Sequence, residues 1–168
     1  TVIADVLAQM PAQKQAEYNQ LIKDLATTGE EGVLSLVKRI NAPGKGSNAH
    51  VDYALSGLSH YVMAKGEESS RAVVAKAYIK ALEQVSERET KAFIIRQLQI
   101  VGQDESVDAL AGYLNDPELS GPAARALAAI GTSNAENALV AGLMVRMGTN
   151  ETKRNIIMAI ADERVEKA

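Results

Sequence analysis

The sequence contains no cysteine and no tryptophan, and Phe93 is the only phenylalanine among its 168 residues. Without cysteine the chain forms neither disulfides nor thiolate metal sites. No apolar run approaches the ~20 residues that a membrane-spanning helix requires. Aromatic residues make up 4% of the chain and all hydrophobic residues 46%, so the core must consist of alanine and aliphatic side chains. A core of that kind favours closely packed helices.

A surplus of basic residues is also missing. The formal net charge is -3, and acidic and basic residues are interspersed along the chain. The calculated isoelectric point is near 5.5. Long-range attraction to a phosphate backbone is weak without a basic surplus, so we predict that nucleic acid is not a partner.

Apolar residues recur at helical spacing in segments separated by Gly, Pro, Asn or Ser, which predicts about ten helices and no strand. One helix should begin at Ser86, where Ser86 and Glu89 have the spacing of a capping box. A charged tail is expected from Asp162 onward. The other expected helices cover residues 2–9, 12–26, 30–40, 67–85, 104–114, 133–147 and 150–161, one from about residue 48 closed by Gly66, and one from Pro117 or Gly121 to Ile130, with Gly131 after it.

The middle of the chain repeats itself. The segment Arg96–Gly102 aligns with Arg125–Gly131, and Ala109-Leu110 aligns with Ala138-Leu139, each pair 29 positions apart. A fixed period of this length is typical of stacked helical hairpins. A single hairpin of two short helices cannot bury both of its inner faces, so neighbouring hairpins must cover them. The repeat therefore predicts an all-α solenoid.

The residues of this repeat resemble a known family. Segments 107–117 and 123–131 are similar to the short HEAT-like helical repeats of the phycobilisome-lyase type, and the resemblance is specific over residues 89–143. Weaker copies of the repeat are recognisable at residues 33–43 and 51–62. The resemblance implies an armadillo-like, right-handed α-α superhelix, with residues 1–168 as one HEAT-like domain. It also implies a non-catalytic scaffold that presents a concave surface to another protein or to a neighbouring domain.

Two observations extend this expectation. Segments 91–98 and 54–58 look like HEAT arrays of large secreted bacterial proteins, which lie beside sugar-active or other catalytic domains. That resemblance implies a helical accessory part of a larger enzyme as the alternative function, and a periplasmic or secreted location in preference to the cytoplasm. Residues 165–168 parallel residues 135–138, which places the end of the sequence at the start of a further helix. We therefore expect the segment to be an excerpt of a longer chain.

One series of surface residues follows the period. Arg96, Arg125 and Arg154 stand 29 positions apart, on the expected second helix of three successive hairpins. In a solenoid this spacing stacks them along one surface, usually the concave one. The planar guanidinium fork suits acidic or carbonyl-bearing ligand groups, so these arginines form the predicted binding ladder. The alternative is a row of solvated arginines paired with nearby carboxylates, and each such pair would contribute little to the stability of the fold.

Other candidates have structural explanations. His50 and His60 lie ten residues apart on one expected helix, and their directions differ by about 80°, so one metal ion cannot bind both. The loop at residues 43–47 precedes a helix but lacks the spacing of a phosphate-binding loop. Asn150-Glu151-Thr152 matches a glycosylation acceptor. The tyrosines at positions 53, 61, 78 and 113 suit partly buried packing sites. We predict no catalytic residue, no metal site and no cofactor.

Overall fold

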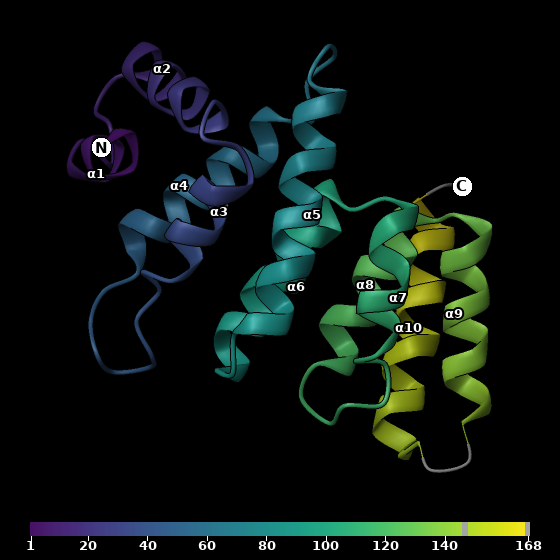
Figure 1. The fold of residues 1–168 in the computed structure, drawn as a ribbon. Coiled ribbons are helices and arrows are strands. Elements are labelled where there is room, and N and C mark those ends of the chain that lie inside the picture. Colours follow the sequence, from purple (N-terminus) through teal and green to yellow (C-terminus); the bar gives the residue numbers. More distant parts are fainter. Residues whose placement is uncertain (146–147, 167–168) are drawn as a thin grey trace.

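The structure, a computed structural model, describes residues 1–145 and 148–166 (Figure 1). Within those residues it contains ten α-helices, one short 3-10 helix and no strand, which confirms the prediction of an all-α fold. The helices are α1 (Val2–Ala8), α2 (Gln15–Ala26), α3 (Gly29–Val37), α4 (Ala49–Tyr61), α5 (Glu68–Gln84), α6 (Arg88–Val101), η1 (Asp104–Ser106), α7 (Val107–Ala111), α8 (Ser120–Ile130), α9 (Ser133–Met144) and α10 (Asn150–Glu166). No helix in the described part of the chain is both long and apolar enough to cross a bilayer.

Helices that follow one another pack as antiparallel pairs, and the pairs pack side by side (Figure 1). On one side α4, α6, α8 and α10 contact each other in series, and we call them the even-helix layer. On the other side α3 packs against α5, and α7 packs against α9. The two layers meet through contacts such as those between α5 and α6 and between α8 and α9. Residues one repeat apart therefore occupy equivalent positions on neighbouring helices.

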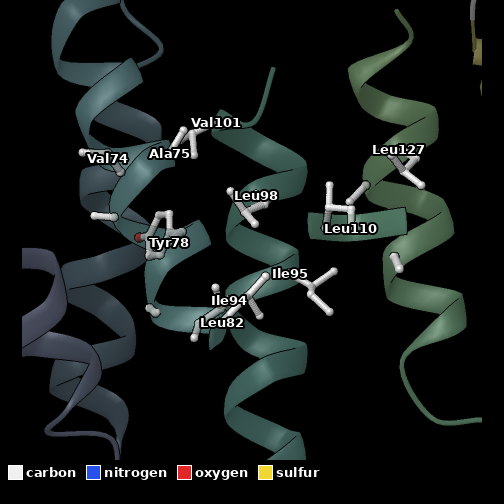
Figure 2. Packing of buried hydrophobic residues seen from close by; sticks show 14 of the residues in the cluster. Val74, Ala75, Tyr78, Leu82, Ile94, Ile95, Leu98, Val101, Leu110 and Leu127 are labelled. Atoms are coloured by element: carbon white, nitrogen blue, oxygen red, sulfur yellow. The ribbon is translucent and has the colours of Figure 1, made fainter. Parts of the chain in front are cut away.

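The core between the layers is aliphatic, as the composition predicts. In α6, the side chains of Ile94, Ile95 and Leu98 are fully buried. Figure 2 shows them between Tyr78 of α5 on one side and Leu127 of α8 on the other. The buried residues form one continuous cluster from α2 to α10, and a small second cluster joins α1 to α2. The apolar period of 3.6 residues thus predicts the buried face of α6 correctly.

Tyr78 is an exception to the expected partial burial of the tyrosines, because its side chain is 0% exposed. Its hydroxyl donates to the carbonyl oxygen of Leu55 at 3.2 Å. It also shares a hydrogen bond of 2.9 Å with the hydroxyl of Ser59. Burial raises the pKa of Tyr78, although the Ser59 hydroxyl acts in the opposite direction. A buried hydroxyl needs such partners, because an unpaired polar group in the core is costly.

Polar contacts about one repeat apart connect successive hairpins. The guanidinium of Arg88 lies 2.8 Å from both carboxylate oxygens of Asp116, 28 positions further on. Asp104 accepts a hydrogen bond of 2.6 Å from the hydroxyl of Thr132, also 28 positions away. Hydrogen bonds from Thr132 and from the next hairpin's Asn134 lower the pKa of Asp104. The first contact joins the start of α6 to the loop before α8, and the second joins the start of η1 to the residue before α9, so each links equivalent parts of successive hairpins.

Some predicted helix ends are correct. Gly131 ends α8 in the left-handed conformation, with a φ of 62°, and its amide donates to the carbonyl of Leu127. Glycine adopts this conformation at little cost, which explains its place after the helix. Thr1 caps α1, because its hydroxyl accepts a hydrogen bond of 3.4 Å from the amide of Ala4.

Other predicted ends are wrong. α6 begins at Arg88 with Glu87 in the capping position and no side-chain cap, so the capping box at Ser86 does not form. α10 continues to Glu166, so the tail expected from Asp162 is helical. Asp, Glu and Arg side chains are compatible with helical structure, and the earlier turns of α10 are already stabilised by packing against neighbouring helices. The prediction that a new helix begins at residue 165 is therefore wrong. Residues 146, 147, 167 and 168, which end two of the expected segments, lie outside the described residues.

Candidate binding surface

The three predicted ladder residues lie on three neighbouring helices of the even-helix layer. Arg96 belongs to α6, Arg125 to α8 and Arg154 to α10, and all three side chains are exposed. α8 contacts both α6 and α10. Among the residues that the structure describes, none of the three forms an ion pair within 4.0 Å. The alternative interpretation, in which these arginines pair with nearby carboxylates, is therefore not supported by any ion pair among the described residues. We call these residues the arginine row.

A second row runs parallel to the first, one helical turn further along each helix. It consists of Ile100, Ala129 and Met158, which are again 29 positions apart. Ile100 is half-buried, Ala129 is exposed, and Met158 is 56% exposed. Residues four apart on a helix lie on the same side, so the two rows adjoin. This apolar row was not predicted, although the 29-residue period was sufficient to find it.

A polar pocket of about 230 Å³ opens between α4 and α6, next to the arginine row. Asn41 and Asn48 form part of its wall. The Asn48 side chain accepts a hydrogen bond of 2.7 Å from the amide of Asn41 and donates one of 3.0 Å to its carbonyl, which closes the loop between them. We call this the Asp52 pocket, and its lining residues are Ile40, Asn41, Asn48, Asp52, Glu89, Thr90, Phe93 and Arg96.

The charges of the Asp52 pocket come from Asp52, Glu89 and Arg96, so it holds two carboxylates and one guanidinium. Burial raises the pKa of Asp52, while the positive charge of Arg96 acts in the opposite direction. Thr90 is only 6% exposed. Within the described residues its hydroxyl has no hydrogen-bond partner, although it lines the pocket. The pocket thus presents carboxylate acceptors, the donors of one guanidinium and a hydroxyl to a ligand.

A smaller pocket of about 130 Å³ crosses α6, α8 and α10. It again combines one guanidinium, from Arg125, with two carboxylates, from Asp162 and Glu163. We call it the Arg125 pocket. Sequence reasoning placed Asp162 in a tail beyond the last helix, and the pocket exists because α10 extends far enough to carry both carboxylates. The remaining lining residues are Gln99, Ala128, Ala129 and Ala159.

A third cavity, of about 260 Å³, is more apolar and lies where α8, α9 and α10 meet. Val140 and Ile160 line it, with Glu136 and Arg164 also in its wall. Val140 is 56% exposed and Met144, four residues later on α9, is 78% exposed. This exposed apolar surface was not predicted. The helical spacing of Val140 and Met144 was the available signal for it.

The remaining candidates do not assemble into a site. His50 and His60 are both exposed on α4. In the described part of the chain, no group of three or more His, Asp or Glu side chains could hold a metal ion. Thr152 of the predicted glycosylation motif is fully buried, and its hydroxyl donates to the carbonyl of Thr149 at 2.9 Å. The loop at residues 43–47 is exposed, and α4 begins after it at Ala49.

No protein-family model, no curated protein and no solved structure matches this chain. The class that the structure defines is an all-helical protein whose paired helices form two layers.

Proposed function

We propose that this chain is a non-catalytic scaffold of HEAT-like repeats, in which residues 1–168 form one right-handed α-solenoid domain. The even-helix layer faces the partner, which is another protein or a neighbouring domain of the same chain. The observation that supports this proposal is the arginine row: three exposed arginines at equivalent positions of adjacent helices, without ion pairs among the described residues.

Stiff helices make such a row effective for binding. Each guanidinium carries five donors in a planar fork, and the helices hold the three side chains at one spacing. Charge-assisted hydrogen bonds contribute about 1.5–3 kcal/mol each, so loss of one weakens binding by roughly tenfold or more. Recognition of this kind uses shape and polar contacts, and needs no cofactor.

A second candidate function is the helical accessory part of a larger enzyme, for example a sugar-active protein, with the active site outside this segment. The exposed apolar side chains of Val140 and Met144 favour it, because a neighbouring domain could cover them. In that case α9 and α10 would form the contact, and the arginine row would be free for a further ligand.

The test compares wild type with a triple variant carrying Arg96→Glu, Arg125→Glu and Arg154→Glu. Random peptides displayed on phage are selected on wild type, and individual peptides are then measured on both proteins. We expect at least a tenfold loss of affinity in the triple variant, with an unchanged helical circular dichroism spectrum. The matched control is Arg39→Glu, because Arg39 is an exposed arginine that follows α3 in the sequence, and this change should leave affinity unchanged. If the selected peptides bind wild type and the triple variant with equal affinity, the arginine row is not the binding surface.

A further inference from the structure

The Asp52 pocket contains opposite charges that face one cavity without pairing with each other. Asp52 of α4 and Arg96 of α6 both line it, and the guanidinium is close enough to act on the pKa of the carboxyl group. Among the described residues, neither side chain forms an ion pair within 4.0 Å or a hydrogen bond. Burial raises the pKa of Asp52, so its carboxylate has lost hydration without gaining a bonded partner. The pocket therefore offers charges that a ligand can pair.

Thr90 is a second, independent observation that indicates a ligand. The residue is only 6% exposed, and its hydroxyl has no partner within the described part of the chain. A buried polar group without a partner is costly, and native structures pair most such groups with protein, water or ligand atoms. Thr90 lines the same cavity as Asp52 and Arg96. An occupant of the cavity can therefore supply the missing hydrogen bond.

The charges in the pocket select the class of ligand. A simple anion would meet the carboxylates of Asp52 and Glu89, and a simple cation would meet the guanidinium of Arg96. A neutral polar molecule would pair with none of the three charges. A zwitterion avoids both repulsions, because its ammonium group can donate to the carboxylates while its own carboxylate accepts hydrogen bonds from the guanidinium.

The volume of the cavity limits the size of that zwitterion. The pocket measures about 230 Å³. A water molecule occupies about 30 Å³ in the liquid, so roughly seven or eight groups of that size fill the pocket. A small α-amino acid such as serine has about seven non-hydrogen atoms, and it carries both charged groups on one carbon. A free amino acid with a small side chain therefore matches the pocket in size as well as in charge.

We propose that the Asp52 pocket binds a small free α-amino acid. The ammonium group of the ligand donates to the carboxylates of Asp52 and Glu89, and its carboxylate accepts hydrogen bonds from the guanidinium of Arg96. The Thr90 hydroxyl is a further hydrogen-bond partner of the ligand. This inference goes beyond the proposed function, because a protein contact on the arginine row needs no small ligand. The selection of peptides tests that contact separately.

The first test compares ligands of one size that differ in charge. The ¹⁵N-labelled protein is titrated with glycine, alanine, serine or threonine at about pH 6.5, where α-amino groups are protonated, and backbone amides are followed by NMR. Serinamide lacks the carboxylate of serine, and glycerate lacks its ammonium group. We expect serine to shift the amides of Asn48, Asp52 and Thr90 in a saturable way, and both analogues to bind at least tenfold more weakly. The proposal is overturned if none of the four amino acids gives a saturable shift up to about 10 mM, or if either analogue binds as tightly as serine.

Variants of the protein then assign the two charged contacts. Arg96→Gln should weaken serine binding by at least tenfold but change the weak binding of serinamide little, because serinamide has no carboxylate to lose its partner. Asp52→Asn should weaken serine and serinamide alike and change the binding of glycerate little. The reverse pattern, in which Arg96→Gln affects serinamide and Asp52→Asn affects glycerate, would contradict the proposed orientation. Lys76→Gln removes an exposed charge of α5 outside the pocket and is the control, with affinity for serine unchanged.

Thr90→Val separates binding from a structural role. Valine keeps the shape of the side chain and removes the hydroxyl, so affinity for serine should fall by about threefold or more. The urea midpoint of the free protein should stay unchanged or rise, because the variant no longer buries an unpaired hydroxyl. A lower urea midpoint with unchanged affinity for serine would show that Thr90 supports the fold and does not contact the ligand.

Discussion

Replacing Tyr78 by phenylalanine removes one hydroxyl from the centre of the helix layers. That hydroxyl donates to the carbonyl of Leu55 and shares a hydrogen bond with Ser59. Ser59 also donates to the carbonyl of Leu55, at 3.0 Å, so its hydroxyl keeps a partner in the variant. The substitution therefore removes hydrogen bonding without leaving a buried donor unpaired. We expect the free energy of unfolding at neutral pH to fall by about 1 kcal/mol.

The same substitution should change how stability depends on pH. Burial raises the pKa of Tyr78 above its ordinary value, so the folded protein keeps a proton that the unfolded chain releases above about pH 10. The unfolded state then binds fewer protons than the folded state, so the free energy of unfolding decreases as pH rises. The decrease approaches about 1.4 kcal/mol per pH unit. The phenylalanine variant lacks this loss, so its stability should equal that of wild type at about pH 10.6.

The assay is guanidinium chloride unfolding, followed by far-ultraviolet circular dichroism at pH 8, 10 and 11. Wild type should be more stable than Tyr78→Phe at pH 8, the difference should shrink at pH 10, and the variant should be the more stable protein at pH 11. Ser59→Ala is the matched control, because that variant retains Tyr78 and should differ from wild type by a nearly constant amount. A difference between wild type and Tyr78→Phe that stays the same at all three pH values would refute the reasoning.

Two further changes test the packing and the polar contacts. A Cβ added at Gly57 would lie 2.1 Å from the Tyr18 hydroxyl oxygen, so Gly57→Ala should destabilise by about 1–3 kcal/mol in urea unfolding. Gly112→Ala, whose Cβ would lie 3.6 Å from its nearest neighbour, should leave the urea midpoint unchanged or raised. Burial tends to raise the pKa of Asp116, but hydrogen bonds from Arg88 and from backbone amides outweigh it and hold the pKa below its ordinary value. The stabilisation by Asp116 is therefore present above about pH 4 and is lost as pH falls further. Wild type and Asp116→Asn should differ in urea midpoint at pH 7 and become more similar at pH 3. An equal difference in urea midpoint at both pH values would contradict this reasoning.

Local residues were sufficient to predict some features and insufficient for others. Gly131 ends α8 as predicted, because the left-handed conformation at a helix end is a property of the glycine itself. The predicted capping box of Ser86 and Glu89 does not form, although the two residues have the right spacing. The first helical residue of α6 is Arg88, so Glu87 and not Ser86 occupies the capping position. Tyr78 looked like an ordinary partly buried tyrosine. Its full burial depends on Ser59 and Leu55 of another helix, which no local pattern identifies.

The sequence by itself determined the helical class, the aliphatic core and the 29-residue period that places Arg96, Arg125 and Arg154 at equivalent positions. These features follow from the spacing of apolar and polar residues along one chain, which a helix converts directly into faces. Only the tertiary structure decided that Asp52 and Arg96 share a pocket, and that α10 brings Asp162 to the side of Arg125. Those contacts depend on how separate helices pack against each other, and packing is set by the fit of many side chains at once.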